Sequence, residues 1–336
     1  MYILYPALYI LRYTHLIIAF EEIMLTDTLT SQQETVLTAK AFVPGHVTGI
    51  FRIFDEYEDS LRCGSTGAGF SVTIGTVTSV SVMEHSSLEI TTDYNNERID
   101  AQVTKTVIRR LTDEYERTLK VHVAHDSSLV SGAGFGSSGA GALGTALALG
   151  HILDNDISVE KAAGYAHIAE ITNRTGLGDV LSQTIGGVEV RIKPGGPGVG
   201  EVKTIAHEDS LRAVLAGAPG LKTSEVLSDP ISRNLINTTG DNLISKIIEH
   251  PTIESFVQSS REFSDTIELK TKRVASALKD LESVGFSNSS MVMLGDSVFC
   301  LCNENDTSRA QEILSKYWNT SQVFTAEISE SGGRLL

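Results

Sequence analysis

The chain has 336 residues, of which 41% are hydrophobic and 21% charged, a balance typical of a globular protein with one large domain or two ordinary ones. A formal net charge of −15, without any basic run, argues against a nucleic-acid surface. Cys63, Cys300 and Cys302 form neither a disulfide framework nor a zinc pattern, so we expect a cytoplasmic protein.

The first residues, MYILYPALYILRYTHLIIAF, are apolar over nearly the length of a membrane span. Pro6, Arg12 and His15 interrupt this stretch, no basic segment precedes it, and acidic residues replace the small-residue cleavage site of a signal peptide. We therefore expect residues 1–33 to be an extension outside the fold, with a start site at Met24. A membrane anchor is the alternative.

Strands dominate the next part of the chain. Alternating residues predict a strand at 34–41, which Pro44-Gly45 ends. The segment GSTGAGF predicts a glycine-rich turn, followed by two β-branched strands. The elements expected after these are short strands at 86–90, 99–103 and 119–124 and a helix at 107–119.

Residues 129–150, LVSGAGFGSSGAGALGTALALG, run from a glycine loop directly into a segment that predicts a buried helix. Ser137 and Ser138 lie at the junction, as residues that can cap the helix or reach a ligand. Such a loop presents unpaired N–H groups and the positive end of the helix dipole to an anion, most often a phosphate. Close helix packing through glycines is the structural alternative.

Two familiar nucleotide motifs do not explain this loop. The P-loop requires a lysine after its last glycine, and the stretch contains none. Gly134, Gly136 and Gly139 match the dinucleotide fingerprint as a pattern. That fingerprint needs a strand after its helix, whereas a second helix begins here at Ser158, so a dehydrogenase is disfavoured.

The helix that Ser158 caps carries an unusual carboxylate. Ala163, Ala166 and Glu170 share one face, and a glutamate on an alanine-rich inward face is costly unless it is paired or binds a metal. A surface glutamate is the alternative. Asp179 follows a glycine turn at 175–178 and, from the sequence alone, could be the N-cap of a short helix before a strand at 188–192.

The composition changes after the Pro-Gly segment at 194–198. Helices and strands mix from there to the end of the chain, which indicates an α+β domain. The expected strands are 201–205, 211–215, 291–294, 297–302 and 321–325, and the expected helices are 231–237, 241–248, 252–262 and 267–284.

Three motifs together resemble the GHMP kinase superfamily. SGAGFGSSGAGALG is similar to the phosphate-binding loop of that family, KAFVPGHVTGIF at 40–51 to its first motif, and GLGDVLSQTIGG at 176–187 to its segment with the catalytic aspartate. The segments GSTGAGF and AHIAEITNRTGLGDV are closer still to its archaeal pantoate kinase branch. Two departures are His46, where several relatives have lysine, and Gly295, a single glycine where the family has a C-terminal glycine loop.

The resemblance implies an α+β, two-domain fold. An N-terminal ATP-binding domain at 34–193 would hold a mixed sheet with helices, and a C-terminal domain at 194–336 would be a ferredoxin-like α/β sandwich. The active site would lie in the cleft between them. The implied function is Mg²⁺- and ATP-dependent phosphorylation of the primary hydroxyl of pantoate, giving 4-phosphopantoate in coenzyme A biosynthesis. The alternatives are a kinase of a mevalonate- or homoserine-like alcohol and a non-catalytic nucleotide-binding regulator.

The resemblance also implies roles for single residues. Asp179 would be the general base, and Ser138 and Glu170 would hold Mg²⁺, although Ser138 could instead cap its helix. The loop residues implied to contact the nucleotide are Gly132, Gly134, Gly136, Ser137, Ser138 and Gly139. The candidates for contact with the substrate are His46, Arg62, Ser65, Thr66 and Arg174. We expect small-molecule partners, a possible homodimer, and no nucleic acid.

Overall fold

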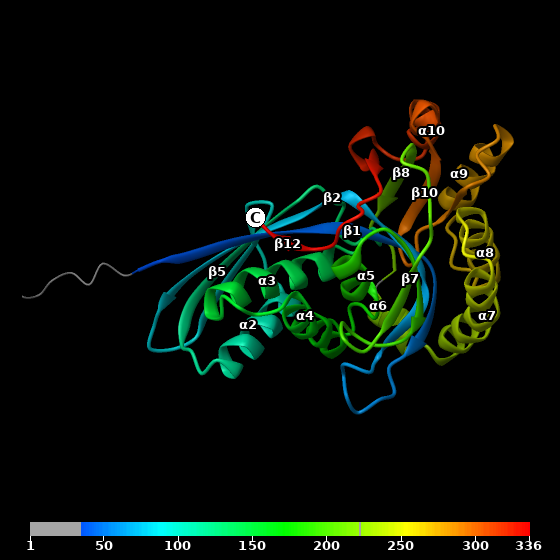
Figure 1. Cartoon of the computed structure of the whole chain (residues 1–336). Helices are drawn as coiled ribbons and strands as arrows, with labels where there is room; N and C mark the ends of the chain where they lie inside the picture. Colours follow the sequence, from blue (N-terminus) through cyan, green and yellow to red (C-terminus); the bar gives the residue numbers. More distant parts are fainter. Residues whose placement is uncertain (1–34, 222) are drawn as a thin grey trace, which may run out of the picture. The chain divides into compact units, whose positions relative to one another are not determined.

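Two long paired strands, β1 (Leu37–Phe54) and β2 (Gly64–Glu84), form the frame of the computed structural model, which describes residues 35–221 and 223–336. The predicted N-terminal extension and the start at Met24 lie outside the described residues. Strand β1 pairs with β2 along its whole length (Figure 1). Residues Leu37–Leu336 form one compact unit, and the domain boundary at 193/194 stays a prediction.

The first sheet has the order β12-β1-β2-β5-β3-β4, and β6 and β7 extend it from the first part of β2. Helices α3 and α4 lie against each other, and α3 packs on β1 and β2 (Figure 1). The other strands are β3 (Glu89–Tyr94), β4 (Glu97–Arg98), β5 (Leu119–Ser127), β6 (Val188–Lys193), β7 (Glu201–Thr204) and β12 (Arg334–Leu335). The helices of this part are α2 (Gln102–Glu114), α3 (Ser137–Leu153), α4 (Val159–Asn173) and α5 (Asp179–Ile185).

The second sheet is antiparallel and has the order β11-β8-β10-β9. Numbered within this sheet the order is 4-1-3-2, which is the ferredoxin-like arrangement that the resemblance implied. Its strands are β8 (Leu211–Ala218), β9 (Ser289–Met291), β10 (Asp296–Asn303) and β11 (Val323–Glu327). Its helices are α6 (Thr223–Ser228), α7 (Pro230–Glu249), α8 (Ile253–Thr266), α9 (Lys272–Ser283) and α10 (Thr307–Leu314), with 3₁₀ turns at Glu304–Asp306 and Thr320–Gln322.

Two predictions that were based on glycine and proline are wrong in β1 and β2. Strand β1 does not end at Pro44-Gly45 but continues through a bulge, where proline is tolerated in a sheet. The predicted turn in GSTGAGF is wrong because these residues are the first part of β2. A side chain at Gly69 would clash with the carbonyl of Val47, so glycine here permits close strand contact and does not mark a turn.

Three further predictions of elements were wrong. Instead of a strand at 291–294, β9 ends at Met291 and a turn follows at Met293 and Leu294. The segment 99–103 is not a strand, because α2 begins at Gln102 with its polar face exposed. The two helices expected at 231–237 and 241–248 are the single helix α7. Gly240 lies in its interior, where a Cβ would lie 2.8 Å from the carbonyl oxygen of Phe51. This glycine therefore lets α7 approach β1 and does not break the helix.

Two apolar clusters hold the unit together. One lies between the first sheet and helices α2 to α5, with Ile108, Leu111 and Leu143 fully buried. The other fills the second sheet and its helices and includes Phe70 of β2, whose ring meets Phe299 edge-on at 5.4 Å. Strands β1 and β2 contribute to both clusters, so the two sheets share part of their core. Within the described residues, no helix is long and apolar enough to cross a membrane.

His125 on β5 is a buried histidine that links three elements. Its Nδ1 lies 2.9 Å from Thr78 Oγ1 on β2, and its Nε2 lies 3.0 Å from Thr104 Oγ1 on α2. Burial lowers its pKa from 6.5 to about 4, because a charged imidazole is poorly solvated there. The folded protein therefore keeps this side chain neutral under mildly acidic conditions.

This burial predicts a pH-dependent loss of stability. Between pH 6.5 and about 4 the unfolded chain binds a proton that the folded protein excludes, so the free energy of unfolding falls as the pH falls through this window. We expect His125→Gln to remove about 3 kcal/mol of that pH dependence. Urea denaturation from pH 7 to pH 4 measures it, with His122→Gln on the half-exposed side of β5 as control. Equal pH dependence in wild type and His125→Gln would contradict the assignment.

Candidate active site

A cavity of 570 Å³ opens beside the N-terminus of α3. Its walls come from the glycine loop before α3, the turn between α4 and α5, strands β1, β2 and β6, and two turns of the second sheet. The polar residues that line it are Thr48, Ser65, Ser131, Ser137, Ser138, Arg174, Thr175, Asp179, Arg191, Thr223 and Ser224. The apolar side chains of the lining are Phe51, Phe135, Leu177, Pro219, Leu221, Met293 and Leu294.

The glycine loop reaches α3 through left-handed backbone conformations. Gly136 is the N-cap of α3 with φ of +68°, and Gly134 has φ of +83°, values that side-chain-bearing residues rarely adopt. Ser138 is therefore not the N-cap, and no side chain caps the helix. The first N–H groups of α3 have no partner within the helix, and Gly136, Ser137 and Ser138 line the cavity, so an anion can bind there.

Turns of the second sheet support this loop from behind. The backbone N–H of Gly220 donates to the carbonyl of Gly132 at 3.0 Å, and Gly295 lies so close to Ala133 that a side chain there would clash with its carbonyl. Gly295 is the lone glycine of the segment that matched the family least well. Its position against the loop shows why a residue without a side chain is needed there.

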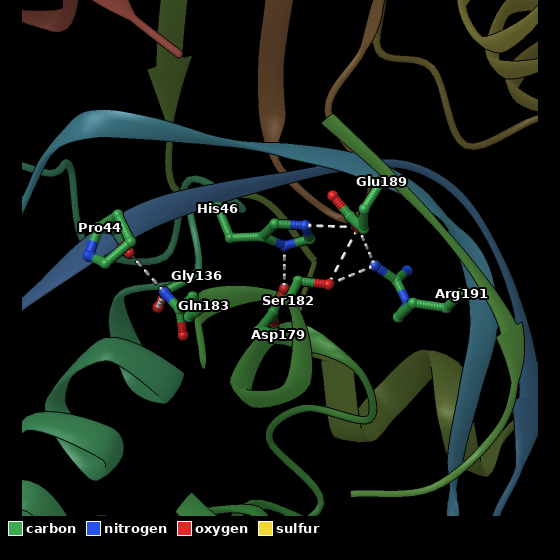
Figure 2. Close-up of polar contacts among 8 residues, drawn as sticks. All are labelled: Pro44, His46, Gly136, Asp179, Ser182, Gln183, Glu189 and Arg191. Carbon is green, nitrogen blue, oxygen red and sulfur yellow. Dashed lines mark hydrogen bonds and ion pairs between the residues drawn. The ribbon is translucent and has the colours of Figure 1, made fainter. Parts of the chain in front are cut away.

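Gln183 on α5 fixes the loop from the side. Its Nε2 donates to the carbonyl of Pro44 at 2.9 Å and to the carbonyl of Gly136 at 3.0 Å (Figure 2). The bulge in β1 thus presents a carbonyl to the same amide that holds the N-cap of α3. Sequence analysis did not identify Gln183, because a glutamine in a short helix carries no signal of its own.

Glu170 of α4 is buried next to the first turn of α3, so it is not a surface glutamate. Ser138 Oγ donates to its Oε1 at 2.6 Å and Thr175 Oγ1 donates to the same atom at 2.9 Å, while Oε2 has no hydrogen-bond partner. Burial raises the pKa of Glu170 to about 7, more than these hydrogen bonds lower it. A side chain at Gly176 would clash with Oε2, so that oxygen has room only because residue 176 is glycine.

This arrangement suits a hard cation. A carboxylate oxygen without a partner beside a serine hydroxyl and a helix terminus provides the oxygen ligands that Mg²⁺ takes. Within residues 35–221 and 223–336, no cluster of three or more His, Cys, Asp or Glu residues forms a metal site by itself. A cation bound by Glu170 and Ser138 would therefore complete its shell with ligand oxygens, as Mg²⁺ does with phosphates.

Asp179 is the first residue of α5 and lines the cavity with 28% of its side chain exposed. The N-cap is Gly178, and no side chain caps this helix either. Burial raises the pKa of Asp179, but the hydrogen bond and charge of His46, with the charge of Arg191, lower it below its usual value. Asp179 therefore presents an ionised carboxylate to the cavity at neutral pH.

Behind Asp179 lies a buried polar cluster, which Figure 2 shows. His46 lies between Asp179 and Glu189, and Arg191 Nη1 donates to Glu189 Oε1 at 2.6 Å and to Ser182 Oγ at 2.9 Å. Arg191 is 1% exposed, yet it is among the residues that line the cavity, and its buried Nε has no hydrogen-bond partner.

Sequence analysis missed Glu189 and Arg191. The strand VEVRI places both on one face, since they are two residues apart, and two opposite charges inside an apolar strand are the signal that could have identified them.

The substrate candidates fall into two groups. Ser65 and Arg174 line the cavity, and a side chain at Gly178 would clash with Ser65 Oγ. Arg62, Thr66 and His46 are not among the residues that line it. Arg62 lies over the ring of Tyr57 at 4.7 Å, and His46 is fully buried behind Asp179. Contact between substrate and any of the five stays a prediction.

Comparison with known proteins identifies the family. A family model described as GHMP kinases N terminal domain matches residues 102–187. A pantoate kinase of Thermococcus kodakarensis is 34% identical over 85% of this chain and 96% of its own length. The chain belongs to the GHMP kinase family.

Further similar proteins include another pantoate kinase and solved structures that share the fold of this chain. A pantoate kinase of Methanocaldococcus jannaschii is 31% identical over 81% of this chain and 96% of its own length. A solved structure described as a phosphotransferase related to CoA biosynthesis pathway is 31% identical, with a TM-score of 0.78, and covers 89% of this chain and 99% of its own. Mevalonate diphosphate decarboxylase from Staphylococcus aureus, 12% identical over 90% and 98% of the chains, shares the fold with a TM-score of 0.68.

Membership of the GHMP kinase family confirms the predicted α+β GHMP fold and makes the protein a small-molecule kinase. A kinase family implies use of ATP. The dinucleotide interpretation of Gly134, Gly136 and Gly139 is wrong, since α4 follows α3 directly and no strand lies between them.

Because Glu170 is a buried carboxylate, we expect its replacement by a neutral residue to stabilise the folded protein. Between pH 4.5 and about 7 the folded protein retains a proton on Glu170 that the unfolded chain releases, so the free energy of unfolding falls as the pH rises through this window. At pH 8, without metal or nucleotide, Glu170→Gln should raise that free energy by up to about 3 kcal/mol. Denaturant titration measures it against Glu160→Gln, an exposed position on α4, and a destabilised Glu170→Gln protein would contradict the assignment.

Proposed function

We propose that this chain is an ATP-dependent kinase that transfers a phosphoryl group to the primary hydroxyl of pantoate, giving 4-phosphopantoate. Its relatives of 34% and 31% identity are pantoate kinases, and the related solved structure of 31% identity is described with the CoA biosynthesis pathway. The observation that carries the proposal is the position of Asp179, which lines one cavity together with the N-terminus of α3 and Arg191. This cavity would therefore bring a phosphate site, a base and a carboxylate site together.

The polar lining fits a small hydroxy acid. Pantoate carries a carboxylate at one end, a primary hydroxyl at the other and two methyl groups between them. Arg191 Nε is a buried donor without a partner, and Ser65 and Arg174 line the same cavity. A guanidinium binds a carboxylate through charge-assisted hydrogen bonds. Phe51 and Leu177 provide apolar surface for the methyl groups.

The cation and nucleotide sites follow from the same geometry. Glu170 and Ser138 would hold Mg²⁺, and the first turn of α3 would bind the β- and γ-phosphates through its N–H groups, with Gly132, Gly134 and Ser137 beside them. Gly139, which was also predicted to contact the nucleotide, faces Gln183 inside α3 and is not among the residues that line the cavity. A bound Mg²⁺ would supply neutralisation of phosphate charge. The hydroxyl oxygen of pantoate would attack the γ-phosphorus in line while Asp179 accepts the hydroxyl proton, and the bond from the γ-phosphorus to the bridging oxygen would break, so that ADP leaves.

The acidic chain and its buried cysteines support the remaining expectations. With a net charge of −15 the partners would be the substrate and ATP and not nucleic acid. The free thiols of Cys63, Cys300 and Cys302 are all buried, which suits the cytoplasm. A homodimer is compatible with this function.

Replacing Asp179 tests the proposed base. We expect Asp179→Asn to lower kcat by roughly 100-fold or more, with little change in ATP affinity, because only the proton acceptor is lost. A coupled assay of ADP release with pantoate, mevalonate and homoserine measures turnover and substrate choice together. Asp126→Asn, an exposed position on β5, is the control. Turnover of Asp179→Asn near that of wild type would remove Asp179 from this role, and preference for another alcohol would replace pantoate.

Two arginines that the sequence analysis treated alike are expected to behave differently. Arg174→Gln should raise KM for pantoate by about 10-fold to 100-fold without changing KM for ATP, because a charge-assisted hydrogen bond is lost. Arg62→Gln should leave both values unchanged, since Arg62 stacks on Tyr57 and does not line the cavity. Steady-state kinetics of the two variants decide this, and equal effects in both would refute the assignment.

A further inference from the structure

His46 lies between two carboxylates in a fully buried position. Its Nδ1 is 2.8 Å from Asp179 Oδ1 and its Nε2 is 3.1 Å from Glu189 Oε1 (Figure 2). An ionised carboxylate only accepts hydrogen bonds, so each contact needs an N–H on the ring. Only the doubly protonated imidazolium makes both contacts at once.

The charges of the cluster also favour a protonated His46. Glu189 is 0% exposed, and its Oε1 accepts from Ser182, Arg191 and His46. With Asp179 and Glu189 ionised and Arg191 positive, the four groups are neutral together only if His46 carries a proton. A buried cluster with a net charge is far more costly than a neutral one.

The elements around His46 leave this pairing undisturbed. Strand β2 presents Gly69, where a Cβ would lie 2.7 Å from His46 Nε2, so a side chain there would displace the ring. The glycine loop presents the carbonyl of Phe135, which accepts from the backbone N–H of His46 at 3.1 Å. Helix α5 contributes Asp179 and β6 contributes Glu189 and Arg191, while Glu170 of α4 faces Asp179 from its other side.

We infer that Glu189 and His46 are a positioning pair for the phosphoryl transfer proposed above, on which this inference rests. Glu189 holds the imidazole protonated, and the imidazolium holds Asp179 ionised through Oδ1. Oδ2, which lies near Gly176, remains available to the substrate hydroxyl. Neither Glu189 nor His46 lines the cavity, so both act through Asp179.

Energetic considerations support a positioning role. Burial lowers the pKa of His46, but Glu189 and Asp179 raise it by more than burial lowers it, so that it reaches about 8. The positive ring in turn lowers the pKa of Asp179, which makes this carboxylate a weaker base. Phosphoryl transfer through a loose transition state depends on position more than on base strength, so a fixed and ionised carboxylate is the better arrangement.

The charge of His46 can be measured without any substrate. In protein labelled with ¹⁵N-histidine, the Nδ1 and Nε2 shifts report the protonation of the ring across pH 6 to 10. The chain has nine histidines, and the signal missing from His46→Asn identifies this one. We expect an imidazolium at pH 7 in wild type and a titration at least about one pH unit lower in Glu189→Gln. Glu201→Gln, an exposed carboxylate on β7, is the matched control.

The kcat–pH profile tests the effect on turnover. With pantoate and ATP, wild type should lose activity above about pH 8, and Glu189→Gln should lose it at a pH lower by about one unit or more, at unchanged KM for ATP. His46→Asn keeps an amide donor for Asp179 but cannot titrate, so its alkaline loss should disappear. A merely structural role would lower the folded fraction without moving either profile.

The outcomes separate the inference from the function. A neutral His46 at pH 7 in wild type, or an unchanged titration of His46 in folded Glu189→Gln, overturns the positioning pair and leaves the proposed kinase intact. Wild-type protein that transfers no phosphate to pantoate overturns the proposed function, and the titration still decides whether Glu189 sets the charge of His46. An unchanged kcat–pH profile in both variants, with the titration shifted, overturns the catalytic part of the inference.

Discussion

The antiparallel pairing of β1 with β2 is the constraint on which the site depends. Its register places His46 opposite Ser71 and Ile53 opposite Ser65, so one ladder sets the depth of the cluster and the position of the cavity wall. The pairing is close because β2 carries glycine at several positions that face β1. Since both strands enter both apolar clusters, the cavity is positioned by the best-buried part of the chain.

The charged groups are arranged by depth from the cavity. Asp179 and Glu170 are held from behind by donors, and each keeps one oxygen for a ligand. The buried Arg191 is shared between Glu189, Ser182 and the cavity. Such an arrangement costs stability in the free protein, because Glu170 Oε2, Glu189 Oε2 and Arg191 Nε are buried without hydrogen-bond partners. Incomplete pairing of this kind is typical of sites that bind ions.

Much of the site was predictable, because its chemistry is carried by short motifs. The glycine loop, Ser138, Glu170 and Asp179 lie in segments whose local sequence already indicated a helix terminus, a buried carboxylate and a turn. The family resemblance added their roles. The helix that carries Glu170 was also predicted, since Ser158 caps α4. The strand expected at 119–124, ahead of the glycine loop, lies within β5.

The rest depends on contacts between distant segments. Gln183 acquires its role only because a bulge in β1 turns a carbonyl towards α5. His46 contacts Glu189, which is 143 residues away in the sequence, and no local pattern predicts that contact. Glycine was the main source of error in the fold. In GSTGAGF and at Gly240 it makes room for a neighbouring backbone, and the sequence does not show which neighbour is present.

The support that Gly220 and Gly295 give to the glycine loop has a consequence for engineering. The glycine loop before α3 and the turns of the second sheet meet at backbone atoms of Gly132 and Ala133, where Gly220 and Gly295 leave little room for a shift. A hybrid enzyme that combined the first half of this chain with the second half of a relative would keep its nucleotide loop in place only if those turns matched to within a fraction of an ångström. When chains of this family are recombined, the joining points are therefore better placed in surface turns elsewhere, so that residues 219–220 and 293–295 stay together with the glycine loop that they contact.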